Sequence, residues 1–269
     1  NRKTGEPIFP VEEREVPQGA VEGDYVSKTQ PFPTKPEPLN PTYFDPDKAF
    51  GFTFWDRGHC KRTAKKLRNE GLFTPPSLEG SIHYPSGVGG NNWGGPAIDP
   101  DRNIMVVNTN NMASLIVMVP REDCSKPLKE LSINKTQERF TNIESNEGAP
   151  YCNLRSMGFF SPLGVPCTEP PWGTLTAVDL NTGEHLWNVP LGTSKDLAPF
   201  PFWWIKGAPN MGGPTVTATG VTFIGATSDH YLRAFDTETG EELAKFRLPT
   251  GGHATPMTYK NKNEIGRAS

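Results

Sequence analysis

The residue types that carry most enzyme chemistry occur in this chain without the spacing that such chemistry requires. No two of the five histidines have the His-x-x-x-His interval that lets two side chains bind one metal ion. They are His59, His83, His185, His230 and His253. Gly87-Val88-Gly89-Gly90 lacks the Lys-Ser/Thr of a phosphate loop, and the absence of a Gly-x-Ser-x-Gly elbow disfavours the common serine hydrolase arrangement. We therefore predict no metal site built by this chain and no catalytic residue that the spacing alone identifies.

Four cysteines leave the redox chemistry open. They are Cys60, Cys124, Cys152 and Cys167. An even count permits two disulfide bridges in three connectivities, and no Cys-x-x-Cys pair indicates zinc. Buried free thiols are an equal alternative, so the count does not decide the redox compartment.

Trp93, within Asn91-Asn92-Trp93-Gly94-Gly95, has a flat indole that could stack on a planar cofactor. A tryptophan buried among strands is the commoner arrangement. We therefore predict that Trp93 is buried.

Charge and hydropathy exclude two classes of partner. The net charge is −3 and no Lys/Arg stripe is present, so we predict no nucleic-acid binding. No run of 18 apolar residues occurs, so we predict no membrane span. The chain opens at Asn1 without the pattern of a signal peptide.

Composition indicates an ordered, strand-rich protein. The chain has 27 Gly and 28 Pro, which favour many turns, while 10% aromatic residues argue against disorder. The Pro-rich segment 16–46 excludes a helix and any central strand, leaving a linker or an ordered surface loop. The only helix predicted is 59–70, with Gly71 as its C-terminal cap.

Strand patterns begin near residue 80. The β-branched runs 104–107 and 115–119 predict two strands, and the polar stretch 121–171 predicts irregular structure. We predict that 95–119 and 172–259 form consecutive antiparallel hairpins.

A repeated hairpin is the strongest pattern in the sequence. Residues 174–187 and 231–244 align so that Asp179 and Asp236, like Gly183 and Gly240, lie 57 residues apart. The opening Asn1-Arg-Lys-Thr-Gly-Glu-Pro-Ile-Phe9 matches the same template. Repeats of this length favour four-stranded propeller blades, although Thr-Gly hairpins also occur in β-sandwiches.

The repeat resembles the tryptophan-docking motif of the pyrroloquinoline quinone (PQQ) dehydrogenases. Ala177-x-Asp179-x-x-Thr182-Gly183-x-x-x-Trp187 matches it in full. The third copy has Ala244 at the tryptophan position, and the first has Phe9 there. In that family the tryptophan docks between neighbouring blades.

Longer stretches resemble the membrane-anchored glucose dehydrogenase branch, which also includes quinate and polyol dehydrogenases. They include Gly71-Leu-Phe-Thr-Pro-Pro76, Pro170-Pro171-Trp172-Gly173, Asp229-His230-Tyr231-Leu232-Arg233-Ala234 and Gly252-His253-Ala254-Thr255-Pro256. The resemblance implies an all-β fold in which residues 1–259 form a partial β-propeller of about four of eight blades. It leaves 260–269 as a tail unlike the family, and it implies a periplasmic protein.

The resemblance also implies a cofactor site. In the family, PQQ lies in the central channel beside a divalent ion, calcium or magnesium. Asn108 matches an asparagine that hydrogen-bonds PQQ, and Asp229 matches an aspartate near it. The family's base and metal ligands come from its N-terminal half and have no counterpart here. We predict that Asn108 and Asp229 face the same side at the inner ends of the blades; the alternative is that Asn108 closes a turn and Asp229 caps one.

The sequence therefore predicts PQQ-dependent oxidation of a sugar, polyol or related small-molecule alcohol, from an incomplete C-terminal portion. One alternative is a non-catalytic propeller fragment, and another is a hydrolase-type activity acquired by the shortened chain. Open blade faces bearing Phe9, Trp187 and Phe246 predict a homo-oligomer, most simply a two-fold dimer, unless segment 16–46 covers them.

Overall fold

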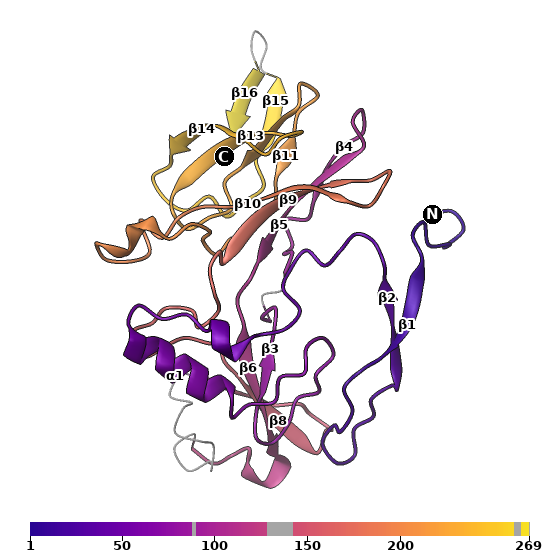
Figure 1. Cartoon of the computed structure of the whole chain (residues 1–269), viewed down its shortest axis with the longest axis vertical. Helices are drawn as coiled ribbons and strands as arrows, with labels where there is room; N and C mark the ends of the chain where they lie inside the picture. Colours follow the sequence, from indigo (N-terminus) through magenta and orange to yellow (C-terminus); the bar gives the residue numbers. More distant parts are fainter. Residues whose placement is uncertain (88–89, 128–141, 261–264, 269) are drawn as a thin grey trace.

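Two four-stranded antiparallel sheets form the upper part of the molecule in Figure 1, within a computed structural model that describes residues 1–87, 90–127, 142–260 and 265–268. The first blade sheet has the order β4-β5-β9-β10, and the second has the order β11-β12-β13-β14. The first comprises β4 (Ala97–Asp99), β5 (Ile104–Asn110), β9 (Gly173–Asp179) and β10 (His185–Pro190). The second comprises β11 (Thr215–Val216), β12 (Val221–Ile224), β13 (Tyr231–Asp236) and β14 (Glu242–Arg247). Strands β4 and β11 are in contact, so the two sheets are neighbours. Each is the first strand in the order of its own sheet, so β4 and β11 are equivalent strands.

A shared core joins the blade sheets. Val106 of β5 and Leu175 of β9 pack in one cluster with Ile224 of β12 and Phe235 of β13. All four are buried, because the apolar residues of these strands are enclosed between the sheets. The predicted all-β class is confirmed.

The tryptophan of the repeated motif docks on the next blade. The indole Nε1 of Trp187 donates a hydrogen bond to the carbonyl of Thr237 over 3.0 Å. Gly240, at φ +74°, lies so close that a Cβ there would be 2.6 Å from Trp187 Cδ2. Glycine is needed at position 240 both for the left-handed backbone and for the space that the indole fills.

Substituting Gly240 with alanine is expected to destabilise the protein through this contact. Gly148 is a matched control, because it has φ +78° and a Cβ added there would meet nothing within 4 Å. Both variants incur the left-handed strain of about 1–2 kcal/mol. Overpacking against Trp187 should make Gly240→Ala about 1–3 kcal/mol worse than Gly148→Ala in urea unfolding. Equal losses would contradict the docking role.

The N-terminal segment packs on the first blade sheet in the same way. A Cβ at Gly183 would lie 2.8 Å from Phe9 Cζ, so Phe9 occupies the docking position of the preceding copy. Lys35 adds an ion pair to Glu184 at 3.2 Å. The prediction that Phe9 and Trp187 lie on an open blade face is therefore wrong, since both side chains pack against glycines of this chain. Phe246 is 49% exposed. The oligomer stays a prediction.

Segment 16–46 is an ordered loop with one edge strand. Strand β1 (Val11–Glu15) pairs antiparallel with β2 (Thr29–Pro33), and these two strands form a sheet of their own. The predicted absence of a helix and of a central strand in this segment is confirmed.

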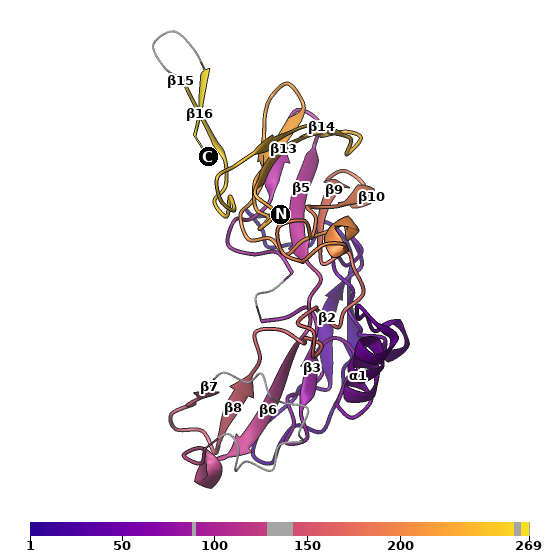
Figure 2. The same cartoon turned by 90° about the vertical axis from the view of Figure 1, so that its left-hand side faces the viewer.

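A third four-stranded sheet, the inserted sheet, is built mainly from the chain between β5 and β9. Its order is β3-β6-β8-β7. It comprises β3 (Ser81–His83), β6 (Ser114–Pro120), β7 (Asn142–Glu144) and β8 (Tyr151–Arg155). Both views place it away from the blade sheets along the long axis (Figure 1 and Figure 2).

This arrangement corrects the predicted run of hairpins in 95–119. Strand β5 pairs with β9, from Ile104 with Asp179 to Asn110 with Gly173, and not with β6. Strand β6 leaves because Val117 and Val119 pack with Leu154 in a separate core. Stretch 121–171 also contains β7 and β8 where irregular structure was expected, and its residues 128–141 lie outside the described residues, as do Val88 and Gly89 of the glycine run.

The helix lies earlier than predicted. Helix α1 spans Phe54–Ala64, and the Thr53 side chain caps it by accepting from the Asp56 amide at 3.1 Å. It ends before Gly71 because Arg68 hydrogen-bonds Gly80 and Ile82 through its backbone, beside β3. The chain from residue 66 is therefore drawn away from the helix. Short 3₁₀ turns also occur, at Pro46–Lys48, Arg121–Asp123 and Phe202–Trp204.

Two disulfides resolve the cysteine alternatives. Cys60 of α1 is bonded to Cys167, and Cys124 is bonded to Cys152 of β8. Both bonds lie in or beside the core of the inserted sheet. The alternative of buried free thiols is wrong.

The last strands form a two-stranded ribbon. Strand β15 (Met257–Lys260) pairs with β16 (Ile265–Ala268), so the tail 260–269 contains a strand. The boundary predicted at residue 259 stays a prediction. Within the described ranges, no helix is both long and apolar enough for a bilayer crossing.

Candidate functional site

Asn108 lies near the C-terminal end of β5 and is only 1% exposed. Its side-chain Nδ2 donates two hydrogen bonds, to Asn210 Oδ1 at 2.6 Å and to the Gly212 carbonyl at 2.7 Å. Its Oδ1 is buried and has no partner among the described residues. Because both amide hydrogens are used, the orientation of the amide is fixed and only an acceptor remains free.

Asn210 holds this orientation from the segment that links β10 to β11. Its Nδ2 donates to the Thr109 carbonyl at 3.0 Å, so its Oδ1 must face Asn108. Asn110 Oδ1 accepts from the Asn210 amide at 2.8 Å, and Asn110 Nδ2 donates back to the Asn210 carbonyl at 2.6 Å. We call Asn40, Asn108, Asn110, Asn111 and Asn210 the asparagine network. The network connects strand β5 of the first blade sheet to the segment that precedes β11 of the second.

Two other buried side-chain atoms also lack partners in the described ranges, namely Ser86 Oγ and Thr168 Oγ1. Asn108 is the one of the three that lies on a blade strand. An unpaired buried acceptor costs about 1–3 kcal/mol of free energy, which a ligand or a water molecule that completes the bond would recover. Asn108 Oδ1 is therefore a candidate ligand contact.

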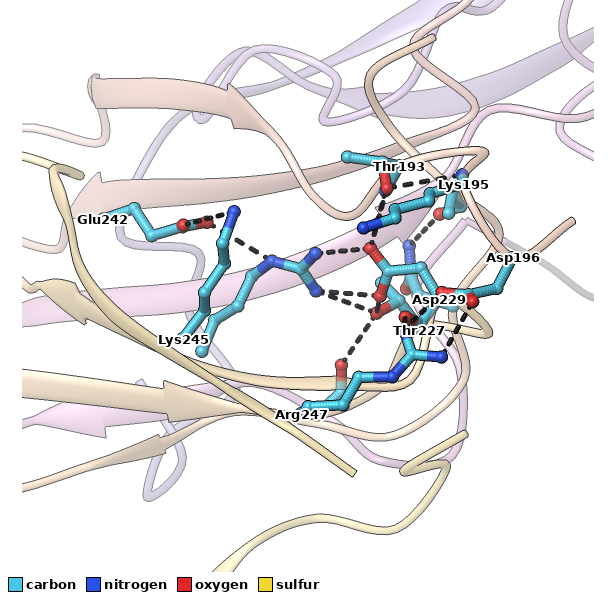
Figure 3. A network of polar contacts seen from close by, with 12 residues as sticks. Thr193, Lys195, Asp196, Thr227, Asp229, Glu242, Lys245 and Arg247 are labelled. Carbon is cyan, nitrogen blue, oxygen red and sulfur yellow. Dashed lines mark hydrogen bonds and ion pairs between the residues drawn. The ribbon is translucent and has the colours of Figure 1, made fainter. Parts of the chain in front are cut away.

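Asp229 lies in the loop between β12 and β13, fully buried. Its two oxygens accept hydrogen bonds from the Thr193 amide at 2.8 Å, from Thr227 Oγ1 and from both terminal nitrogens of Arg233 (Figure 3). The Arg233 side chain is 4% exposed and also meets Glu242 at 3.3 Å. All strong acceptor positions of Asp229 are thus occupied by the chain itself.

The surrounding groups stabilise the ionised form of the Asp229 carboxylate. Burial alone would raise the pKa of Asp229, but hydrogen bonds from Arg233 and Thr227 and the Arg233 charge outweigh it and lower the pKa below the ordinary value. Asp229 is therefore ionised at neutral pH. It ties the loop before β13 to Thr193, just after β10.

Asn108 and Asp229 have related places in consecutive blades. Strand β5 is next to β4 in its sheet, and β12 is next to β11, where β4 and β11 are the strands through which the two sheets touch. Asn108 lies near the C-terminal end of β5, and Asp229 lies in the loop after β12. Both also hydrogen-bond the segment between β10 and β11. The structure thus connects both residues to one segment, while their contact with a cofactor stays a prediction.

Trp93 departs from its prediction. Its side chain is 66% exposed, because Asn92 and the glycines that follow place it in a turn where Asn92 Oδ1 accepts from the Trp93 amide. Sequence reasoning also missed Asn210 and Asn110, since nothing local indicates that residues 100 positions apart exchange hydrogen bonds. Among the described side chains, no three His, Cys, Asp or Glu residues are grouped to hold a metal ion.

Comparison with known proteins identifies the family. A family model described as "Glucose/ethanol/alcohol dehydrogenase, beta-propeller domain", of the PQQ class, matches residues 1–266. The chain is 38% identical to quinoprotein glucose dehydrogenase of Escherichia coli over 97% of its own length and 33% of that protein. It is 37% identical to quinoprotein glucose dehydrogenase A of Acinetobacter calcoaceticus, with the same coverage of both chains.

A third relative, quinate/shikimate dehydrogenase (quinone) of Acinetobacter baylyi, is 36% identical over 96% of this chain and 32% of that protein. The chain thus spans about a third of the length of these relatives. The predicted partial propeller is confirmed by the family match and by the two blade sheets. The chain belongs to the β-propeller family of the PQQ-dependent glucose, ethanol and alcohol dehydrogenases.

Proposed function

We propose that this chain is the C-terminal portion of a PQQ-dependent dehydrogenase that oxidises a sugar, a polyol or a related alcohol. Family membership supports the reaction class, and relatives named for glucose, quinate and glycerol support hydroxylated substrates. The observation that carries the proposal is the free, buried Oδ1 of Asn108.

The chemistry of that atom fits the cofactor. Oxidised PQQ has a pyrrole N–H donor, whereas its carboxylates and quinone carbonyls are acceptors. Because Asn108 offers only an acceptor, it would hold the cofactor through a donor of this kind. When bound, PQQ supplies the two-electron acceptor for alcohol oxidation. Asn108 would orient the ring system through this one hydrogen bond.

Asp229 has a different role in this proposal. Its oxygens are already occupied by Arg233, Thr227 and Thr193, so we propose that it positions the loop before β13 and the segment after β10. Direct contact between Asp229 and PQQ remains the sequence-based expectation. The base and the calcium or magnesium ligands are assigned, by the resemblance, to the N-terminal half of the family's chains.

A periplasmic location is part of the proposal. Two disulfides in the inserted-sheet region support it, because such bonds persist in oxidising compartments. The resemblance to periplasmic dehydrogenases points the same way.

Titration of the purified 269-residue chain with PQQ, with and without calcium or magnesium, tests the proposal. We expect saturable quenching of intrinsic fluorescence, and an affinity about tenfold weaker in Asn108→Ala, because one buried hydrogen bond is lost. Asn188→Ala is the control, since Asn188 lies on the outer strand β10 and its side chain bonds Thr176 of β9, which is not part of the asparagine network. No saturable binding, or equal loss in both variants, would refute the role of Asn108.

A further inference from the structure

A cavity that does not include Asn108 lies where four separate parts of the chain meet. Its volume is about 360 Å³, within the range of sites for small molecules. The walls come from segment 41–48, from Tyr84 just after β3, from Asn111 just after β5, and from segment 169–171. Rigid apolar surface comes from Pro41, Pro170 and Pro171. The ring of Phe44 packs edge-on against the ring of Tyr84, with 6.2 Å between the ring centroids.

Polar groups with unused bonding capacity line this cavity. The Lys48 ammonium, the Glu169 carboxylate and the Tyr84 hydroxyl make no hydrogen bond or ion pair with another described residue. Asp45 uses one oxygen, which accepts from the Asp47 amide at 2.9 Å, and has its second oxygen free. Hydrogen-bond donors and acceptors therefore occur together among the residues that line the cavity and remain available to a ligand.

The mixture of groups selects the class of ligand. Two carboxylates disfavour an anion, and the Lys48 ammonium disfavours an organic cation. Burial and the nearby charge of Glu169 raise the pKa of Tyr84 to about 12, so its phenol is a neutral donor at physiological pH. Carboxylates that accept from hydroxyls, a lysine and a phenol that donate, and aromatic and proline faces for C–H groups together suit an uncharged polyhydroxylated molecule.

We propose that this cavity is a binding subsite for a sugar or polyol, with Glu169, Lys48 and Tyr84 as its main hydrogen-bonding groups. The assignment of substrate class rests on the proposed function. The position of the cavity and its free polar groups come from the structure alone.

The asparagine network links this subsite to the proposed cofactor contact. Asn111 lines the cavity, and its Oδ1 accepts from Asn40 Nδ2 at 2.8 Å. Asn40 also donates to the Asn110 carbonyl at 2.8 Å, and Asn110 exchanges hydrogen bonds with Asn210, which holds Asn108. A connected set of side-chain and backbone hydrogen bonds therefore runs from the wall of the subsite to Asn108.

Ligand-observed NMR on the purified chain without PQQ tests the subsite. Saturation-transfer titrations with D-glucose and with glycerol should show saturable binding of at least one of the two. Inorganic phosphate should not compete with that ligand. Tyr84→Phe and Glu169→Gln should each weaken that binding about tenfold, since each removes one hydrogen bond to the ligand. Tyr25→Phe and Glu79→Gln are matched controls on exposed positions away from the cavity and should bind as the unmodified chain does.

The outcomes separate the two proposals. Saturable sugar or polyol binding that weakens only in the cavity variants supports the subsite even if PQQ does not bind. Absence of binding by both probes, displacement by phosphate, or equal effects in cavity and control variants overturns it even if PQQ binds. Glu169 is exposed, so Glu169→Gln should fold normally and remains decisive if Tyr84→Phe is unstable.

Discussion

Replacing Asp229 with asparagine should lower the free energy of unfolding by about 3–5 kcal/mol, the cost of leaving a buried charge without its partner. The substitution keeps the shape of the side chain and removes its charge. Glu242, at 3.3 Å, would then be the remaining carboxylate partner of Arg233, whose side chain is 4% exposed. Thr193 and Thr227 would also lose a charged acceptor.

Urea unfolding at neutral pH measures this effect, with Glu144→Gln as control. Glu144 pairs with Arg155 at 2.9 Å, but the two side chains are 44% and 43% exposed, so about 0–1 kcal/mol should be lost. The double variant Asp229→Leu with Arg233→Met should be more stable than Asp229→Asn, because no charge remains buried. If Asp229→Asn costs no more than Glu144→Gln, the ion pair does not stabilise the blade.

The same pair gives a pH dependence of defined sign. The pKa of Asp229 is lowered in the folded protein, because the hydrogen bonds and charge of Arg233 outweigh burial. The unfolded chain therefore binds more protons as the pH falls below the ordinary aspartate pKa of about 4, and stability is lost there. The stability difference between the unmodified chain and Asp229→Asn should accordingly shrink at pH values below about 4.

Removing the Cys60–Cys167 disulfide should have the second large effect. The bond joins residues 107 positions apart, whereas Cys124–Cys152 joins residues 28 apart. Chain-entropy estimates give about 4.8 kcal/mol for the longer loop and about 3.6 kcal/mol for the shorter. The variant Cys60→Ala with Cys167→Ala should thus be the less stable of the two alanine pairs.

Non-reducing urea unfolding of both double variants checks this order. Cys60 and Cys167 are fully buried between α1 and the inserted sheet, so lost packing adds to the loop-closure effect. A reversed order would show that the shorter bond stabilises the inserted sheet more than loop length indicates.

The blade turns could be predicted because their information is local. Asp236 Oδ1 accepts from the Thr239 amide at 2.8 Å, and Gly240 supplies the positive φ, so a few neighbouring residues determine the turn. The period of the copies then indicated a propeller, and the tryptophan position indicated the docking residue. Copies 174–187 and 231–244 both have the glycine with positive φ, although they lie in different blade sheets.

The remaining features depend on contacts between distant residues. The end of α1 depends on the backbone bonds of Arg68 to Gly80, which no helix signal reveals. The orientation of Asn108 depends on Asn210, 102 positions away. Its identity as a candidate came from the resemblance, but the fact that it offers only an acceptor required the coordinates.

The separation of β5 from β9 also sets an order of events during synthesis. Strand β5 ends at Asn110 and its partner β9 begins at Gly173, with β6, β7 and β8 of the inserted sheet encoded between them. At translation speeds of about 5–20 residues per second, on the order of 3–12 s pass between the synthesis of β5 and the synthesis of β9. During that interval the Ile104–Asn110 edge is open to intermolecular pairing. A chaperone that holds nascent strands should therefore raise the yield of this chain most when it acts before residue 173 is translated.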